Sequence, residues 1–171
     1  MRYCAWVESG TMPATERAET FTKFERILRD RGLHEALRFL NSRTPHRFTG
    51  IYFFDPPMLR NMHLIDAYDP EQSKGDDALM AETYCSIVGR TREMLTTADT
   101  RVDPRLVGHP ARARVLSYCG VLLRDIEGKP RGTLCHFDLL PCDVPINELP
   151  LMEAAASIVL ETVQLGPVRQ L

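Results

Sequence analysis

The chain has 171 residues, of which 44% are hydrophobic and 26% are charged, and its formal net charge is -2. This length suits one domain with its own core, and the composition excludes a wholly disordered or collagen-like chain. A charge so close to neutral provides no basic field for nucleic acid, and no apolar run approaches the length of a membrane span. We therefore expect one globular domain with neither nucleic acid nor membrane among its partners.

The cysteines are odd in number and scattered along the chain, at Cys4, Cys85, Cys119, Cys135 and Cys142. This distribution is not typical of a disulfide framework, and no Cys-x-x-Cys occurs. The first residues also lack the basic start and apolar stretch of a secretory signal. We therefore expect a cytoplasmic protein whose reduced thiols pack like small hydrophobic side chains.

Two helices are predicted near the beginning of the chain. Residues 1–12 are interpreted as an N-terminal extension, and a helical pattern of apolar residues starts near Pro13, where a missing N–H costs little. Gly32 is expected to end that helix, because glycine adopts the positive φ of a helix C-cap. A second helix is expected directly after it, over residues 33–41.

The middle of the chain alternates between predicted strands and irregular segments. Residues 47–54 and 59–68 are rich in β-branched and aromatic side chains and predict two strands of a hairpin. Residues 78–88 predict a helix, and residues 94–98 predict a short strand. The loop at 99–110 is rich in proline, glycine and charge.

Two further strands are predicted at residues 115–124 and 131–138, joined by a loop that contains Gly128. A last helix is expected from about residue 148 to 164, so that the domain spans 13–165 and a tail covers 166–171. Strands joined by hairpins form antiparallel sheets, which predicts an α+β fold. The helices from both ends would cover one sheet face, and the middle segment would cover the other face over a pocket.

Three stretches of the sequence together resemble a GAF domain. They are SYCGVLLRDIEGKPRGTLCHFD, ALMAETYCSIVGRTREMLTTADTRVDPRL, and the opening RTPHRFTGIYFFD with LRNMHLIDAYD. The resemblance covers about residues 14–164. It implies a GAF-like (profilin-like) fold with a central antiparallel sheet, N- and C-terminal helices on one face and a ligand pocket on the other.

The resemblance also implies a function. GAF domains are mostly sensory or regulatory modules that commonly dimerise through their terminal helices. We therefore expect a stand-alone sensor, or a fragment of a longer one, that binds a small organic ligand and signals through a homodimer or an effector protein. Binding would act by shifting the population of interface geometries, without catalysis. A scaffold with a collapsed pocket is a further alternative.

The expected ligand-binding residues lie on the predicted strands, the middle helix and the loop that follows it. Tyrosine offers both a ring to stack and a hydroxyl to place, and an arginine suits an anionic ligand group. The loop charges have a second interpretation, as salt bridges of a solvated loop. The candidates are Tyr52, Phe54, His63, Tyr84, Cys85, Val88, Asp99, Asp103, Arg105, Tyr118, Val121 and Phe137.

A covalently attached bilin is not expected. Some GAF domains attach one through a cysteine followed by histidine, and Cys135 and His136 form such a pair here. Alternation along a strand places these two side chains on opposite sheet faces, so they cannot line one cavity. The pair is interpreted as a buried thiol beside a half-exposed imidazole. Cys85 lies nearer the bilin position of such domains, but Ser86 follows it.

The enzymatic alternative is a thiol-dependent reductase that resembles free methionine sulfoxide reductase, which has the GAF fold. This chemistry needs a nucleophilic thiolate and a second thiol that resolves the sulfenic acid. Cys85 lies roughly where that family has a cysteine. The family's nucleophile ends a Gly-His-Ile-Ala-Cys stretch, whereas here Gly108-His109-Pro110-Ala111 is followed by Arg112, and the next cysteine is Cys119.

No metal or cofactor is predicted. The five histidines show no ligand spacing at helix or hairpin distance, and no glycine-rich phosphate loop is present. The Asn-Lys-x-Phe-Asp-Glu motif of cyclic-nucleotide-binding GAF domains is absent, which disfavours cyclic nucleotides.

Overall fold

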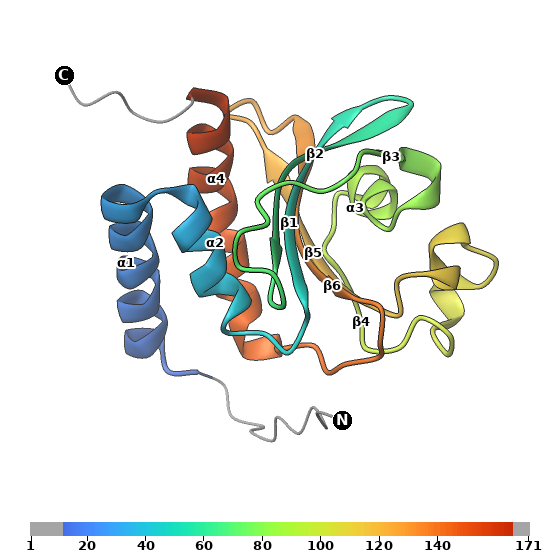
Figure 1. Cartoon of the computed structure of the whole chain (residues 1–171), viewed down its shortest axis with the longest axis horizontal. Helices are drawn as coiled ribbons and strands as arrows, with labels where there is room; N and C mark the ends of the chain where they lie inside the picture. Colours follow the sequence, from blue (N-terminus) through green and yellow to red (C-terminus); the bar gives the residue numbers. More distant parts are fainter. Residues whose placement is uncertain (1–11, 166–171) are drawn as a thin grey trace.

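The structure, a computed structural model, describes residues 12–165. The predicted tail and all but the last residue of the predicted extension lie outside the described residues. Within them, a six-stranded sheet separates two unequal layers (Figure 1). Every pairing is antiparallel, as the hairpin pattern predicted. The strand order is β3-β2-β1-β6-β5-β4. The strands are β1 (Phe48–Asp55), β2 (Met58–Asp66), β3 (Ala78–Leu79), β4 (Leu95–Thr97), β5 (Ser117–Arg124) and β6 (Pro130–Asp138).

The helices from both ends of the described chain lie on one face of the sheet, as predicted, and the middle segment lies on the other (Figure 1). The first group is α1 (Ala14–Arg31), α2 (Leu33–Asn41) and α4 (Leu149–Leu165). The second face carries α3 (Cys85–Thr91) and three short 3-10 helices, η1 (Met80–Glu82), η2 (Pro104–Leu106) and η3 (Pro110–Ala113). A fourth, η4 (Ile146–Glu148), leads into α4. Gly32 separates α1 from α2 with a φ of 87°, which glycine adopts without strain.

The prediction of a continuous helix over 78–88 is wrong. Residues 78–79 instead pair with β2, where Leu79 lies opposite Met58, and helix α3 starts only at Cys85. The Met80 amide donates to the Pro57 carbonyl at 2.9 Å, which ties this segment to the β1–β2 hairpin. Pairing with the open edge of β2 therefore prevails over local helix propensity.

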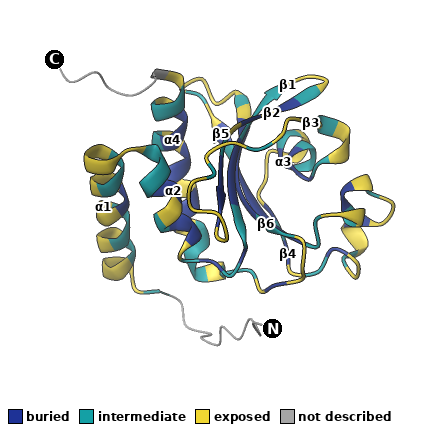
Figure 2. Ribbon diagram, viewed as in Figure 1, coloured by how far each residue is buried: buried dark blue, intermediate teal, exposed yellow. Residues whose placement is uncertain are grey.

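Apolar side chains form two buried clusters, one on each side of the sheet. Figure 2 shows that buried residues concentrate in the sheet, whereas much of α1 is exposed. The larger cluster packs α1, α2 and α4 on the sheet and includes Phe24, Leu37, Leu134 and Val159. The smaller cluster lies between the sheet and the middle segment and includes Leu59, Tyr84, Val88, Leu106 and Tyr118. Strand residues alternate between the two clusters because side chains of a strand point to opposite faces.

A β-bulge between β1 and β2 changes which side chains face the helices. Ile51 pairs with His63, but the next β1 residue, Tyr52, pairs with Asn61, so Met62 is the extra residue. Ile51 belongs to the cluster under the helices. His63 therefore points toward the helices as well, whereas Tyr52 points toward the middle segment.

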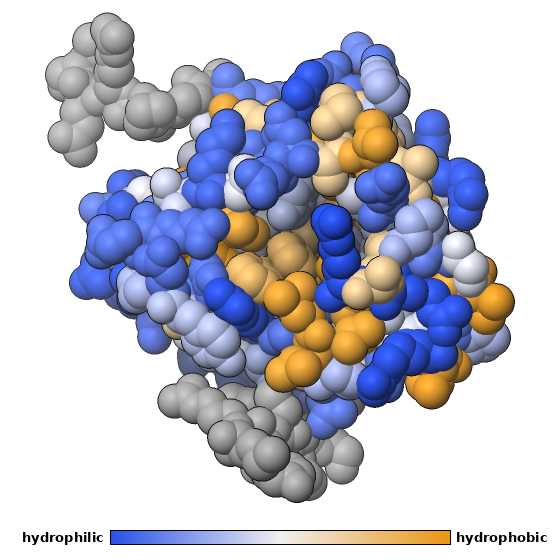
Figure 3. Space-filling model, turned by 45° about the vertical axis from the view of Figure 1, so that its right-hand side comes forward, coloured by the Kyte–Doolittle hydropathy of each residue, from blue (hydrophilic) through white to orange (hydrophobic). Residues whose placement is uncertain are grey.

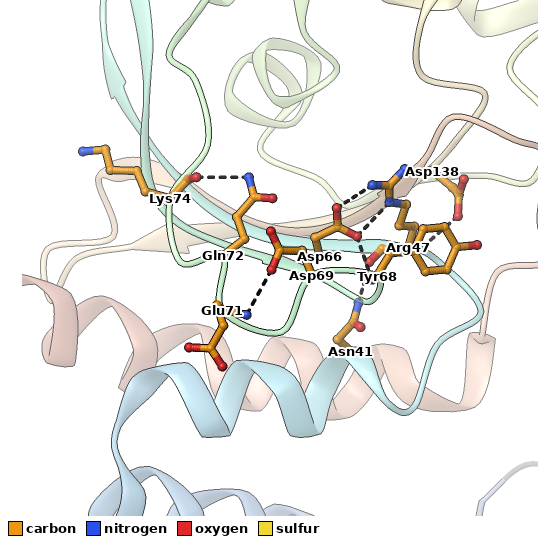
Figure 4. A network of polar contacts seen from close by, with 9 residues as sticks. All are labelled: Asn41, Arg47, Asp66, Tyr68, Asp69, Glu71, Gln72, Lys74 and Asp138. Carbon is orange, nitrogen blue, oxygen red and sulfur yellow. Dashed lines mark hydrogen bonds and ion pairs between the residues drawn. The ribbon is translucent and has the colours of Figure 1, made fainter.

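A polar network at one end of the sheet holds three strands together (Figure 4). The Arg47 guanidinium donates to both carboxylate oxygens of Asp66, and its Nε lies 2.7 Å from Oδ1. The Arg47 backbone amide donates to Asp138 at 2.7 Å. The guanidinium also lies 4.6 Å from the Phe48 ring centre and 4.5 Å from that of Tyr68. Arg47 thus joins the start of β1 to the ends of β2 and β6.

The described surface is mixed in character. Figure 3 shows apolar residues gathered among hydrophilic ones on one side of the molecule. The exposed large hydrophobic residues include Val102, Val107, Leu140 and Ile146. Within residues 12–165, none of the helices is both long and apolar enough to cross a bilayer.

Candidate functional site

A cavity of about 130 Å³ lies between the sheet and the middle segment, on the side away from the terminal helices. Strands β1, β2, β5 and β6 provide one wall, and residues 76–85 with 111–115 provide the other. This is the face on which the sequence predicted a pocket. The lining residues are Tyr52, Leu59, Asp76, Ala78, Glu82, Thr83, Tyr84, Cys85, Ala111, Val115, Tyr118, Cys135 and Phe137.

The innermost part of the cavity is a cluster of buried sulfur and hydroxyl groups. Cys85, Tyr118 and Cys135 are 4%, 3% and 1% exposed. The Thr133 hydroxyl donates to the Cys85 sulfur at 3.0 Å, and the Tyr118 hydroxyl lies 3.3 Å from the same sulfur. The Cys85 and Cys135 thiols also lie close enough to shift each other's pKa. Helix α3 and strands β5 and β6 therefore bring together two thiols that are far apart in the sequence.

Hydrogen bonds make the two cavity thiols unequal. The contact with Cys135 and the hydrogen bonds from Thr133 and Tyr118 lower the pKa of Cys85, although burial opposes them. The same contact with Cys85, together with burial, raises the pKa of Cys135 well above its usual value. Cys85 is therefore the thiol of this pair that ionises first, which makes it the better nucleophile.

Aromatic rings form the sides of the cavity. Tyr84 and Tyr118 meet edge to face with ring centres 5.5 Å apart, and the Tyr52 and Phe137 centres are 6.4 Å apart. The Tyr84 hydroxyl donates to the Val115 carbonyl at 3.2 Å, which ties the ring to the segment between η3 and β5. Ring pairs of this kind hold a cavity open with defined walls.

The cavity opens to solvent beside two acidic residues. Asp76 and Glu82 are exposed, in contrast to the buried residues at its inner end. Burial raises the pKa of Tyr52 well above its usual value, and the nearby charge of Asp76 adds to that effect. The Asp76 carboxylate therefore lies close enough to the Tyr52 hydroxyl to influence it.

Five of the twelve predicted site residues line this cavity: Tyr52, Tyr84, Cys85, Tyr118 and Phe137. Phe54 and Val88 belong to the same apolar cluster, but they are not among the lining residues. The role of all these residues in ligand binding stays a prediction.

Two predicted site residues lie on the wrong face of the sheet. Val121 is packed under the terminal helices, since it alternates with Tyr118 in β5 as Cys119 and Leu123 do. His63 faces α2, where its Nε2 lies 3.0 Å from Nδ1 of His34. His63 lies on the helix face because the β-bulge adds Met62 to β2, which reverses the alternation of the side chains after it.

The three predicted loop residues do not line the cavity either. Asp99 pairs with Arg101 at 2.7 Å, and Asp103 pairs with Arg105 at 2.6 Å. Arg105 also donates to the Thr96 carbonyl at 2.6 Å. The second interpretation, a loop closed by its own salt bridges, therefore describes this segment, and Arg105 is not placed among the lining residues, where an anion clamp would have to lie.

The sequence analysis missed most of the mouth and part of the inner end of the cavity. Asp76, Ala78, Glu82 and Thr83 lie in a segment whose path depends on pairing with β2. Cys135 was recognised as a buried thiol, and its placement on the opposite face from His136 is confirmed. Cys135 belongs to the cluster on the cavity side, whereas His136 pairs with Cys119, which lies under the helices. His136, however, is only 1% exposed, so the expectation of a half-exposed imidazole is wrong. Strand alternation could have placed Cys135 on the same face as Tyr118. Tyr118 pairs with Phe137, and Cys135 lies two residues before Phe137 in β6, so all three side chains point to one face.

Cys119 is not part of the site. It lies beneath α4, where its thiol is 3.7 Å from the Met152 sulfur, and burial raises its pKa to about 12. Among the described residues, no group of three or more histidine, cysteine or acidic side chains is arranged to hold a metal ion.

Comparisons with known proteins agree on the fold. No known family profile matches the sequence, and no curated protein matches it. Among solved structures, the GAF domain of an Acinetobacter phosphoenolpyruvate-protein phosphotransferase is similar, with a TM-score of 0.66 and 15% identity over 90% of this chain and 96% of that one. A putative GAF sensor protein from Burkholderia vietnamiensis gives 0.61 and 18% over 85% and 94%.

An enzyme is equally similar in structure. Free methionine-R-sulfoxide reductase from Neisseria meningitidis, solved with its substrate, has a TM-score of 0.66 and 15% identity over 95% of this chain and 96% of that one. Identities this low define the fold alone. The protein therefore has the GAF-domain fold, which the sequence resemblance predicted.

Proposed function

We propose that the protein is a regulatory domain that binds a small organic ligand in the cavity and transmits binding to the helices on the opposite face. The observation that carries this proposal is the cavity itself, with buried polar groups at its inner end and aromatic sides. Pockets of this kind are the usual binding sites of small molecules.

Strand β5 offers a direct route from the cavity to the helices. Tyr118 lies at the inner end of the cavity, and the next residue, Cys119, contacts Met152 of α4. A ligand that moves Tyr118 would therefore move the surface on which α4 packs. Helices α1 and α4 also pack on each other. The interface with a homodimer partner or an effector that docks on these helices would then change, provided that the ligand favours one geometry of that interface.

The test uses one substitution that fills the cavity and one that does not. Thermal stability of the protein is screened against small metabolites, and compounds that raise it are tested again with Ala78→Phe and Ala81→Phe. Ala78 lines the cavity, whereas its neighbour Ala81 is exposed and does not. Stabilisation should be lost in Ala78→Phe and kept in Ala81→Phe.

The second measurement is the oligomeric state, by light scattering with and without a stabilising compound. We expect a homodimer whose association constant changes on binding. A library that yields no stabilising compound would refute the proposed function and favour the scaffold. The reduced thiols at the inner end of the cavity suit the cytoplasm, where we propose that the domain acts.

The pair Cys85 and Cys135 favours a second candidate, a thiol-dependent reductase of small sulfoxides. The Cys85 thiolate would attack the sulfoxide sulfur and take its oxygen, which releases the thioether and leaves a sulfenic acid. The Cys135 thiol would then condense with it to give a disulfide and water, and an external dithiol such as thioredoxin would restore both thiols. Arg112 in place of the reductase nucleophile argues against the family's own mechanism.

An assay of free methionine sulfoxide reduction decides this candidate. Activity that is lost in Cys85→Ser and Cys135→Ser, and kept in Cys119→Ser, would establish the reductase. Cys119 is the matched control because it is equally buried but lies on the other face of the sheet. Absence of activity in the unmodified protein would eliminate the candidate.

A further inference from the structure

The charges that line the cavity are all of one sign. Among its lining residues, Asp76 and Glu82 carry carboxylates, and none is a lysine, arginine or histidine. Arg112 and Arg114 adjoin lining residues in sequence but do not line the cavity themselves. Arg112 donates to the Arg101 carbonyl, and its charge acts on Tyr84 only as a minor influence against the burial that raises the pKa of that residue. A ligand that enters the cavity therefore meets negative charge at its mouth.

Two hydroxyl groups at the cavity, those of Tyr84 and Thr83, offer acceptors rather than donors. Tyr84 donates its proton to the Val115 carbonyl, and Thr83 donates to the Met80 carbonyl at 2.9 Å. Each of these oxygens has lone pairs left for a ligand, but no proton. The inner sulfur of Cys85 also accepts, from Thr133. An anionic ligand needs donors and positive charge; Tyr84 and Thr83 supply no donor, and none of the lining side chains is positively charged.

Ring faces and edges surround the remaining space. Tyr52, Tyr84, Tyr118 and Phe137 line it together. Aromatic faces attract cations through their quadrupole, most strongly where water is excluded. The volume of about 130 Å³ is slightly smaller than an engineered cavity that holds benzene, so the group that enters is compact.

We propose that the cavity binds a small organic cation, an ammonium compound whose charged group lies among the tyrosine rings and is attracted by Asp76 and Glu82. This inference rests on the proposed ligand-binding function and specifies the class of ligand. It excludes carboxylates, phosphates and cyclic nucleotides as the ligand.

The test compares three probes of nearly equal shape by calorimetry and thermal stability. Choline is the cation, 3,3-dimethylbutan-1-ol is its neutral isostere and 3,3-dimethylbutanoate is the anion. We expect choline to bind at least about tenfold more tightly than the neutral probe, because a ring cage with carboxylates favours charge over shape. The anion should not bind.

Charge variants show whether the two carboxylates are responsible. The double variant Asp76→Asn, Glu82→Gln should weaken choline binding several-fold and leave the neutral probe unchanged. The matched control is Glu25→Gln, Glu127→Gln, which removes the same charge from two exposed residues outside the cavity and should leave choline binding unchanged.

Each other outcome overturns the proposal. Equal binding of choline and the neutral probe, or binding of the anion, refutes the cation but leaves a ligand-binding domain. No binding of choline also refutes the cation, and the metabolite screen then decides the proposed function separately. If Ala78→Phe does not weaken choline binding, choline binds elsewhere on the protein, and the assignment to this cavity is refuted.

Discussion

The imidazole rings of His46 and His136 lie stacked under the terminal helices, with centres 6.1 Å apart and an angle of 18° between their planes. Both side chains are 1% exposed. Asn41 donates to the Thr49 oxygen at 2.9 Å, and the same hydroxyl shares a hydrogen bond of 2.7 Å with Nδ1 of His136. Burial lowers the pKa of His136 and so favours its neutral imidazole. Within residues 12–164, Nε2 of His46 is the buried side-chain nitrogen or oxygen that has no hydrogen-bond partner.

This pair should make the fold sensitive to mild acid. Burial lowers the pKa of His46 to about 4 and that of His136 to about 3, from about 6.5 in an unfolded chain. The unfolded state therefore binds more protons below pH 6.5. The stability contributed by the neutral imidazoles is full above that pH and is lost as the pH falls toward 4. The loss is on the order of 3 kcal/mol for each histidine over the whole range.

Urea unfolding between pH 7.5 and 5 measures this effect. The midpoint should fall as the pH is lowered, and His136→Gln should reduce the slope although it lowers stability at neutral pH. A slope that stays the same in the variant would show that other groups cause the acid sensitivity.

Cys85 should react faster with thiol reagents than Cys119. It lines the cavity and hydrogen bonds lower its pKa, whereas burial raises the pKa of Cys119 to about 12. In a Cys4→Ser background, N-ethylmaleimide should modify Cys85 before Cys119, and peptide mass spectrometry measures both rates. Earlier modification of Cys119 would contradict the assignment of the two sheet faces.

Gly132→Ala should destabilise the fold. A Cβ at this position would lie 1.9 Å from the Tyr52 carbonyl oxygen, which belongs to the neighbouring strand and cannot move aside without breaking the sheet. We expect a loss of about 1–3 kcal/mol in the free energy of unfolding.

Gly89→Ala is the matched control for that substitution. Its Cβ would meet the Phe54 ring at 2.8 Å, and Phe54 is a half-buried side chain that can rotate. Alanine also favours helix α3, so stability should change little. Equal losses in the two variants would mean that the close approach of β1 and β6 is not what requires glycine.

Arg47→Ala should cost about 2 kcal/mol of stability, because it leaves the Asp66 carboxylate buried without its cation. Asp66 is only 4% exposed, and the Arg47 hydrogen bonds lower its pKa. Chemical denaturation measures the loss.

Arg60→Ala is the comparison for that substitution, since Arg60 pairs with Asp55 and Asp77 on the surface, where an ion pair adds little. If both arginines prove equally dispensable, the network at the end of the sheet is not a stabilising one.

The sequence by itself determined the order of the helices and of most strands. Residues 115–138 show why, because two largely apolar stretches on either side of a turn that contains Gly128 are typical of a hairpin. Alternation along the strand likewise predicted that the Cys135 and His136 side chains lie on opposite faces of the sheet. These features depend on neighbours along the chain, which a sequence displays directly.

The tertiary structure alone decided the composition of the cavity. One bulge residue, Met62, sets His63 on the helix face, and pairing with the edge of β2 draws residues 78–79 out of a helix and places Asp76 and Glu82 at the mouth. The contact of Cys85 with Cys135 joins residues fifty positions apart. Register and long-range pairing arise from the packing of the whole sheet, and no local pattern of side chains encodes them.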